Sequence, residues 1–353
     1  MIDMPMAVAE YSALAGKTRA MYGKLLTAEN YRDLMRQKSV ADVAAWLKNN
    51  TSYRDVVSSL NESEIHRVPF ENMLRKSLLN DYRKLFCFSQ GNVKEFLKVA
   101  LLKHEVESVK RLFRVLEMER TVTLVEDSLL FLSKYDTLDI GRLTKSKTSH
   151  EFIGNLQGTG YYNVLRPFLS EDKSHNLFHI EMALDMYYIK LVLSKKKKLL
   201  QGLDASMVER SLGTEIDVLN LLWIYRGRMI YNLDRSVILS YFIPQGYMLS
   251  SELVYELADA QDPETFKQIV ARTRYVELFL SDKHLFAELN FNEYMYRMHL
   301  SFLRKYGFSI SSALSYLHLK EFELSNIISI LEGIRYHLPV EAITKYVVGI
   351  QVQ

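Results

Sequence analysis

The segment Ser39-Val-Ala-Asp-Val-Ala-Ala-Trp-Leu47 combines a helix start signal with a helical spacing of apolar residues. Ser39 and Asp42 have the spacing of a capping box, in which side chains bind the free backbone N–H groups at the start of a helix. The apolar residues that follow recur at the i, i+3, i+4 and i+7 positions of one helix face. They are Val40, Val43, Ala44 and Leu47. The segment therefore predicts an amphipathic helix that packs against a neighbour.

Similar signals occur elsewhere in the 353-residue chain. Asp262-Pro263 pairs an N-cap acid with a proline at the first helical position, and an apolar stripe follows at Phe266, Ile269 and Val270. A late stripe comprises Leu324, Ile327, Ile328 and Leu331. Alternation at period two, which is typical of strands, is not sustained, and the chain holds only 14 Gly and 6 Pro. We therefore predict an all-α fold.

Composition excludes several classes of protein. A net charge of +3 gives no footprint for a nucleic-acid binder, so we expect no nucleic-acid partner. Cys87 is the single cysteine, which favours a reducing compartment, and its neighbours Phe86 and Phe88 predict a buried, inert thiol. The first residues do not have the apolar run of a signal peptide. The longest uncharged stretch, 236–251, is interrupted by Pro244 and is too short to span a membrane.

Three landmarks recur along the chain at a period near 110 residues. The first is Thr-x-Tyr, at Thr51-Ser-Tyr53, Thr159-Gly-Tyr161 and Thr273-Arg-Tyr275. The second is a glutamate that begins an apolar helix of the form E-x-x-Φ-x-x-x-Φ, at Glu71, Glu181 and Glu293. The third is an acidic doublet, at Glu105/Glu107, Glu215/Asp217 and Glu321/Glu323. Their common order predicts three similar helical lobes with pseudo-threefold symmetry, at residues 1–120, 121–235 and 236–353.

The doublets do not have the geometry of a catalytic acid/base pair. Residues i and i+2 of a helix lie about 200° apart around its axis, so they do not share a substrate. We expect one member of each doublet to face solvent or a lumen, and the other to pair with a base or to favour the positive end of its helix.

Other motifs with chemical potential are incomplete. Gly16-Lys17-Thr18 resembles the end of a P-loop, but Tyr11 stands where the first glycine belongs, and we favour the start of a helix. His175 and His179 have zinc-ligand spacing without a third ligand. Gly158-Thr-Gly160 is typical of a turn. The sequence thus predicts no cofactor, no metal and no catalytic site.

The basic run Lys195, Lys196, Lys197 and Lys198 ends the helix that contains Glu181. Four lysines match the negative C-terminal end of a helix, and a solvated face is the simpler interpretation. Binding of anionic lipid headgroups is the alternative.

Three stretches resemble the C subunit of prokaryotic V-type and A-type ATPases, a relative of the eukaryotic d subunit. They are Arg19-Ala-Met-Tyr-Gly-Lys-Leu-Leu-Thr27, the turn Ile243-Pro-Gln-Gly246, and Leu319-Lys-Glu-Phe-Glu-Leu-Ser-Asn-Ile-Ile328 with Glu332-Gly-Ile-Arg-Tyr336. The resemblance extends over nearly the whole chain. It implies three helical lobes arranged as a funnel.

The resemblance also implies a function. Members of this family connect the central axle of the soluble ATPase head to the membrane rotor ring, and they transmit torque for proton or sodium transport. The chain would then be a monomeric, non-catalytic subunit on the cytoplasmic face of the membrane, without direct nucleotide binding. The doublets Glu105/Glu107, Glu215/Asp217 and Glu321/Glu323 would supply axle-facing or structural charge, and Lys195–Lys198 would lie toward the membrane.

Two other functions remain open from the sequence alone. A helical-repeat adaptor that binds partner helices also has internal repeats, although solenoids have periods of about 20 to 50 residues. A nucleotide-dependent enzyme would rest on Gly16-Lys17-Thr18, and ATP binding that Lys17→Ala abolishes would identify it.

Overall fold

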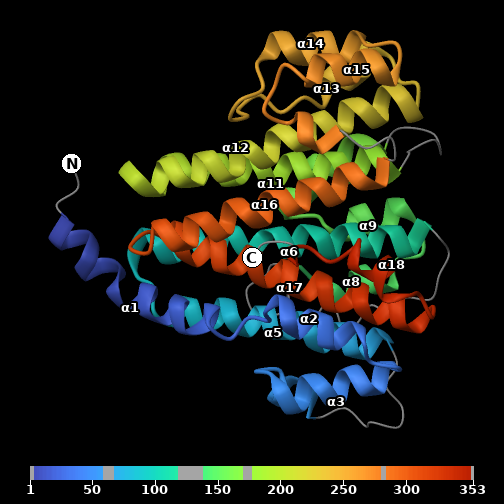
Figure 1. Ribbon diagram of the computed structural model, residues 1–353. Coiled ribbons are helices and arrows are strands. Elements are labelled where there is room, and N and C mark those ends of the chain that lie inside the picture. The colour runs from blue at the N-terminus through green and yellow to red at the C-terminus, as the bar shows by residue number, and fades with distance from the viewer. Residues whose placement is uncertain (1–3, 59–66, 118–137, 170–176, 280–283, 351–353) are drawn as a thin grey trace. The chain divides into compact units, whose positions relative to one another are not determined.

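The computed structural model describes residues 4–58, 67–117, 138–169, 177–279 and 284–350, and the regular structure in these ranges is helical throughout (Figure 1). The all-α prediction is confirmed for this part of the chain. Packing divides the chain into two compact units, which are described separately. Unit 1 comprises Met1–Asp55 and Gln201–Gln353, and unit 2 comprises Val56–Leu200.

Unit 1 is built around one long helix near the C-terminal end of the chain. Helix α17 packs against α1, α2 and α3 as well as against α16 and α18, so the first and last parts of the chain meet in this unit. Its α-helices are α1 (Met4–Tyr22), α2 (Ala28–Met35), α3 (Val40–Asn50), α12 (Gly202–Tyr225), α13 (Arg235–Ser240), α14 (Ser251–Asp259), α15 (Pro263–Val270), α16 (His284–Lys305), α17 (Ile310–Arg335) and α18 (Val340–Thr344). A π-helix, η4 (Arg226–Ile230), and a 3₁₀-helix, η5 (Val276–Phe279), complete it.

Unit 2 is built around two long helices, α6 and α11, which pack along each other. Its elements are α5 (Arg67–Cys87), α6 (Gly91–Glu117), α8 (Ile140–Lys145), α9 (Ser149–Asn155), α10 (Gly160–Leu165), η3 (Arg166–Leu169) and α11 (Leu177–Leu199), and α4 (Arg54–Val57) crosses the boundary between the units in sequence. The rings of Phe113 and Phe152 meet edge to face at 5.5 Å between centroids, and both are buried. This contact ties α9 to α6.

The helix starts follow the sequence signals in large part. Ser39 accepts the N–H of Asp42 at 3.1 Å, but the Asp42 carboxylate accepts the Ser39 hydroxyl rather than a backbone N–H, so the predicted capping box is only half formed. A complete capping box occurs at Thr27 and Asn30, where none was predicted. Asp262 caps α15 as predicted.

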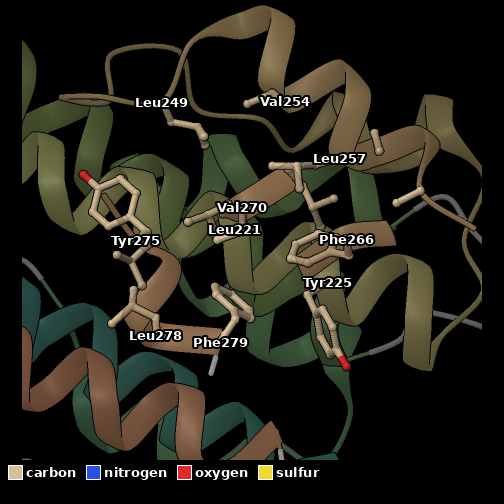
Figure 2. Close-up of a cluster of buried hydrophobic side chains, with 14 of the residues drawn as sticks. Leu221, Tyr225, Leu249, Val254, Leu257, Phe266, Val270, Tyr275, Leu278 and Phe279 are labelled. Atoms are coloured by element: carbon tan, nitrogen blue, oxygen red, sulfur yellow. The ribbon is translucent and has the colours of Figure 1, made fainter. Parts of the chain in front are cut away.

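The predicted apolar stripe of α15 reaches the core of unit 1. Phe266 and Val270 are fully buried, and Ile269 packs against the same cluster. The ring of Phe266 lies 5.1 Å from that of Tyr225 and 5.5 Å from that of Phe279 (Figure 2). Aromatic pairs at these separations add to the stabilisation that burial provides.

One order of elements occurs three times along the chain: two short helices, a Thr-x-Tyr segment, a short helical segment, then two long helices. The three sets are α2, α3, Thr51–Tyr53, α4, α5 and α6, then α8, α9, Thr159–Tyr161, α10 with η3, α11 and α12, then α14, α15, Thr273–Tyr275, η5, α16 and α17. This is an order along the sequence, and it does not show that the three sets are arranged symmetrically in space. The predicted lobes 1–120, 121–235 and 236–353 therefore stay a prediction.

The landmark glutamates do not begin their helices. Glu71 and Glu181 lie four residues after the starts of α5 and α11, and Glu293 lies nine residues after the start of α16. No glycine or proline interrupts the stretch 284–292, so α16 extends further toward its N-terminus than predicted. The helix face at i+3 and i+7 is buried or half-buried as expected.

Candidate functional site

The six doublet carboxylates lie on three long helices, and each doublet has one buried and one half-buried member. The buried members are Glu105 on α6, Asp217 on α12 and Glu323 on α17. The half-buried members are Glu107, Glu215 and Glu321. The buried residue is the first of the α6 doublet and the second of the other two, so the doublets are not equivalent residue by residue. Their role toward an axle stays a prediction.

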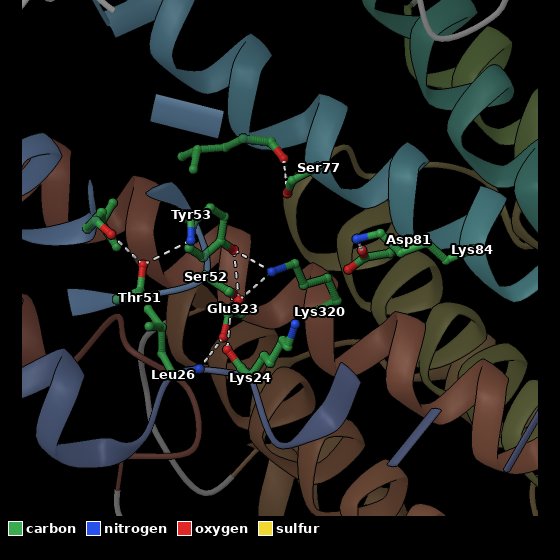
Figure 3. Close-up of polar contacts among 12 residues, drawn as sticks. Lys24, Leu26, Thr51, Ser52, Tyr53, Ser77, Asp81, Lys84, Lys320 and Glu323 are labelled. Carbon is green, nitrogen blue, oxygen red and sulfur yellow. Dashed lines mark hydrogen bonds and ion pairs between the residues drawn. The ribbon is translucent and has the colours of Figure 1, made fainter. Parts of the chain in front are cut away.

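Glu323 is the centre of a buried polar cluster in unit 1, which we name the Glu323 cluster (Leu26, Tyr53, Lys320 and Glu323; Figure 3). The Tyr53 hydroxyl and the Lys320 ammonium each donate to Glu323 Oε1 at 2.7 Å. Lys320 also donates to the Tyr53 oxygen at 2.7 Å, and the Leu26 N–H donates to Glu323 Oε2. The cluster joins the N-terminal segment to α17.

The Glu323 cluster is buried, so breaking its hydrogen bonds costs much free energy. Tyr53, Lys320 and Glu323 are each at most 5% exposed. Burial and the adjacent Glu323 carboxylate hold the pKa of Tyr53 well above its ordinary value, so Tyr53 is a donor. A buried carboxylate requires such partners, because an unpaired charge in a low dielectric is strongly unfavourable.

Asp217 forms a second buried cluster in unit 1, the Asp217 cluster (Asp217, Tyr275 and the backbone of 247–249). The Tyr275 hydroxyl donates to Asp217 Oδ2 at 2.6 Å, and the same oxygen accepts the N–H groups of Tyr247, Met248 and Leu249 at 3.1, 2.6 and 3.2 Å. Burial raises the pKa of Asp217, although these hydrogen bonds oppose the shift.

The turn Ile243-Pro-Gln-Gly246 has a direct connection to the Asp217 cluster. A Cβ atom at Gly246 would overlap Asp217 Oδ1, so the close approach of backbone to carboxylate requires glycine there. The turn therefore has a structural role: it leaves room for the buried carboxylate of Asp217.

The two Thr-x-Tyr segments of unit 1 share the same local bonds. Thr51 and Thr273 each donate to a carbonyl of the preceding helix, at 2.6 and 2.7 Å, and each accepts the N–H of its own tyrosine at 3.1 Å. This geometry aims Tyr53 and Tyr275 at the two buried carboxylates. In these two copies the motif thus ends a helix and directs a tyrosine hydroxyl to a buried carboxylate.

Two asparagines to which the sequence analysis gave no role complete these clusters. The side-chain oxygen of Asn220 accepts the backbone N–H of Ile243 at 3.1 Å, and its side-chain amide donates to the Ile243 carbonyl at 2.9 Å. Asn326 binds Val348 in the same way, at 2.8 and 2.9 Å. Each asparagine lies three residues after the buried acid on its helix, and this Asp/Glu-x-x-Asn spacing is the signal that would have identified them.

Unit 2 holds a charged network on α6 and α11. Lys110 donates to Asp185 at 2.7 Å and lies 2.6 Å from Glu107, and Arg114 pairs with the landmark Glu181. Burial opposes the charge of Lys110, but the two carboxylates outweigh it and raise the pKa of Lys110. Burial is the largest influence on Asp185 and raises its pKa to about 6, despite Lys110.

Asp185 gives a prediction about pH. A carboxyl with a raised pKa in the folded state holds its proton there after the unfolded chain has released it. Its contribution to the free energy of unfolding therefore falls as the pH rises from about 4 to about 6. We expect Asp185→Asn, which does not titrate, to remove this fall. Urea unfolding midpoints of both proteins across this range test it, and parallel pH profiles would contradict it.

The first doublet lies near a pair of tyrosines in unit 2. Burial and then the Glu105 carboxylate raise the pKa of Tyr187. The Tyr187 ring meets that of Tyr161, the tyrosine of the second Thr-x-Tyr, at 5.2 Å between centroids. Glu105 is thus close enough to Tyr187 to influence its pKa.

Two sequence interpretations change with the structure. Cys87 is exposed, contrary to the prediction of a buried thiol, because Leu85 and Phe86 turn toward the core at the end of α5 and the next residues turn away. Gly16-Lys17-Thr18 lies within the second half of α1, not at its start, and has no phosphate-binding loop geometry. Thr18 is buried and donates to the Leu14 carbonyl.

The remaining motifs are placed in part. Lys195, Lys197 and Lys198 are exposed and Lys196 is half-buried, all in the last turns of α11. Gly158 has a φ of +89° in the turn before α10, which confirms the turn, and Thr159 caps that helix. His175 lies outside the described residues. In the described ranges no group of histidine, cysteine or acidic residues could hold a metal ion.

The helices also bear on the question of a membrane span. In the part of the chain that the structure covers, none is long and apolar enough to cross a bilayer.

These features define an all-α protein whose order of elements occurs three times and whose long helices carry buried, hydrogen-bonded acids at the helix junctions. Residues 14–346 match the family model of the ATP synthase (C/AC39) subunit. The chain belongs to this family, which confirms the resemblance seen in the sequence.

Individual relatives extend over nearly the full length. The C subunit of the A-type ATP synthase of Methanocaldococcus jannaschii is 24% identical, over 98% of this chain and 88% of the relative. Its counterpart in Methanococcoides burtonii is 25% identical, over 96% of this chain and 94% of the relative. The counterpart in Archaeoglobus fulgidus is 24% identical, over 96% of both chains.

Proposed function

We propose that this protein is the rotor-coupling subunit of an A/V-type ATP synthase. It would link the central axle of the soluble ATPase head to the membrane rotor ring and transmit torque for proton or sodium transport, without a catalytic site of its own. The observation that carries the proposal is the family match over residues 14–346, together with relatives named as the C subunit of A-type ATP synthases.

In this proposal the chain forms three similar lobes, 1–120, 121–235 and 236–353, arranged as a funnel with pseudo-threefold symmetry. The threefold order of elements and the shared bonds of Thr51 and Thr273 support it. An open helical-repeat adaptor would hold its first and last helices at opposite ends. Here α1, α2 and α3 pack against α17, which favours a closed arrangement over the adaptor.

The proposal assigns surfaces to two partners. The half-buried acids Glu107, Glu215 and Glu321 would face the axle, and the buried acids would hold the helices that carry them. Lys195–Lys198 would lie toward the membrane ring on its cytoplasmic face. The protein would act as a monomer in the complex, with no nucleotide or nucleic acid bound.

Transmission of torque requires stiff connections between helices. The low content of glycine and proline leaves few soft points within the helices. The Glu323 and Asp217 clusters fix the helix junctions of unit 1 by buried hydrogen bonds, several of them to charged groups. A polar, locked junction suits a part that must turn without bending.

Reconstitution tests the coupling function. A complex assembled without this chain should hydrolyse ATP at the rate of the isolated head but should no longer drive ion movement. Adding the chain should restore ion movement. Ion transport that is unchanged without the chain would overturn the proposal.

A charge test addresses the assigned surface. The triple variant Glu107→Gln/Glu215→Gln/Glu321→Gln should weaken binding to the purified axle subunits. The control replaces three exposed glutamates: Glu95→Gln, Glu264→Gln and Glu341→Gln. Equal binding by the two triple variants would contradict the axle-facing assignment and leave the coupling function to be judged by reconstitution.

A further inference from the structure

The turns between consecutive long helices lie in stretches of sequence that contain no acidic residue. These turns join α5 to α6, α11 to α12, and α16 to α17. The stretches around them hold 12 of the 45 basic residues of the chain and none of its 42 acidic residues. They are residues 82–94, 186–203 and 294–320. Acids and bases are nearly equal in number over the whole chain, so positive charge is concentrated near these turns.

Each of the three turns also has one exposed large apolar side chain close to it. Phe88, Leu203 and Phe308 are 42%, 42% and 43% exposed. Single apolar residues on a surface are ordinary, but here each one accompanies a stretch with charge of one sign. Phe88 belongs to unit 2, whereas Leu203 and Phe308 belong to unit 1.

In unit 1 the start of α12 meets the start of α17 (Figure 1). The Ile310 N–H of α17 donates to Asp204 Oδ1 of α12 at 3.0 Å, and the Tyr11 hydroxyl of α1 donates to Asp204 Oδ2. The exposed residues Leu203 and Phe308 are one and two residues from this contact in the chain. The Asp204 carboxylate thus holds these helix ends together.

Three basic side chains accompany Phe308. Arg304 and Lys305 are exposed in the last turn of α16. The Arg19 guanidinium of α1 lies 5.7 Å from the centre of the Phe308 ring, and it lies so close to Gly307 that a Cβ atom there would overlap it. Among the described residues no acidic side chain forms an ion pair with these three cations. Their charge is therefore available to a partner.

We propose that this part of unit 1, the basic tip (Arg19, Leu203, Arg304, Lys305 and Phe308), binds the surface of a bilayer that contains anionic phospholipids. Basic side chains near such a surface are attracted to its headgroups, and exposed Phe and Leu side chains enter the boundary between headgroups and acyl chains.

The chemistry of the basic tip favours lipid over an acidic protein segment. Its two apolar side chains lie at a turn and at a helix start, and a bilayer boundary accepts such side chains without a matching shape. The proposal adds a lipid contact to the proposed coupling function, on which it rests for the presence of a membrane, but it can be tested on the isolated chain.

Flotation of the full chain with vesicles tests the proposal. The chain should bind vesicles of phosphatidylcholine with one part in three of phosphatidylglycerol, and not vesicles of phosphatidylcholine alone. Binding should fall as salt rises, because salt screens the attraction. Arg304→Gln/Lys305→Gln should lower the partition coefficient by about fivefold for each lost charge. Phe308→Ser should lower it without a change in charge.

Arg335→Gln/Lys345→Gln is the matched control. It removes the same charge from exposed positions, at the far end of the 26-residue α17 and beyond. The control should bind within twofold of the unchanged chain, and circular dichroism verifies that all variants fold.

Three results would overturn the proposal. The first is no binding to the anionic vesicles at low salt. The second is an equal loss of binding in the two double variants, which would reflect net charge alone. The third is binding to polyglutamate but not to the vesicles, which would assign the basic tip to an acidic protein partner. None of these results bears on coupling, which reconstitution tests separately.

Discussion

Glu323→Ala is expected to lower the free energy of unfolding by about 3 to 5 kcal/mol. The substitution leaves the Lys320 ammonium buried without its carboxylate and removes the acceptor of both the Tyr53 hydroxyl and the Leu26 N–H. Breaking a buried pair on one side costs more than the pair contributes, because the remaining charge stays out of water. Urea denaturation followed by circular dichroism measures the change.

Two comparisons isolate the cause of this loss. Glu321→Ala, on the same helix, removes a half-buried acid that lies 3.6 Å from His318 and should cost about 0 to 1 kcal/mol. The triple variant Glu323→Leu/Lys320→Met/Tyr53→Phe removes all three polar side chains and should recover most of the stability that Glu323→Ala loses. A triple variant as unstable as the single one would show that burial of charge is not the cause.

Gly246→Ala is expected to destabilise the protein by about 1 to 3 kcal/mol. The new methyl group would overlap Asp217 Oδ1, and the carboxylate has no room to retreat without losing the N–H groups of 247–249. Thermal unfolding measures the change. Hydrogen exchange of the amides 247–249 should accelerate as well.

Gly16→Ala provides the matched control for this substitution. Gly16 is exposed within α1, and a Cβ atom there meets no heavy atom within 4 Å. Alanine at that position should stabilise the protein by about 0.5 to 1 kcal/mol through its better helix propensity. Equal effects of the two glycine substitutions would refute the steric argument at Gly246.

The repeated features of this fold could be predicted from the sequence. Thr51 and Thr273 stand at equivalent points because each ends a helix by local hydrogen bonds, and local bonds leave a pattern in the sequence. Asp262-Pro263 identifies a helix start for the same reason. The helical class and the order of the landmarks follow from such short-range signals.

The hydrogen-bond partners of the repeated tyrosines could not be predicted from local sequence patterns. Tyr53 binds Glu323, 270 residues further along the chain, and no local rule connects the two. The prediction that Cys87 is buried was wrong. Its aromatic neighbours indicate an apolar stretch, but they do not indicate the direction in which each side chain points at the end of a helix. The doublets were found by spacing, but which member is buried depends on tertiary packing.

The distance between Tyr53 and Glu323 in the chain also affects how the protein is made. At about 5 to 20 residues per second, a ribosome needs roughly 15 to 55 s to synthesise the 270 residues between them. During that time α2 and α3, whose residues Leu34 and Leu47 are fully buried in the finished protein, have no α17 to pack against. The nascent N-terminal helices are thus the segment that chaperones would have to shield, and the core of unit 1 closes only when synthesis is nearly complete.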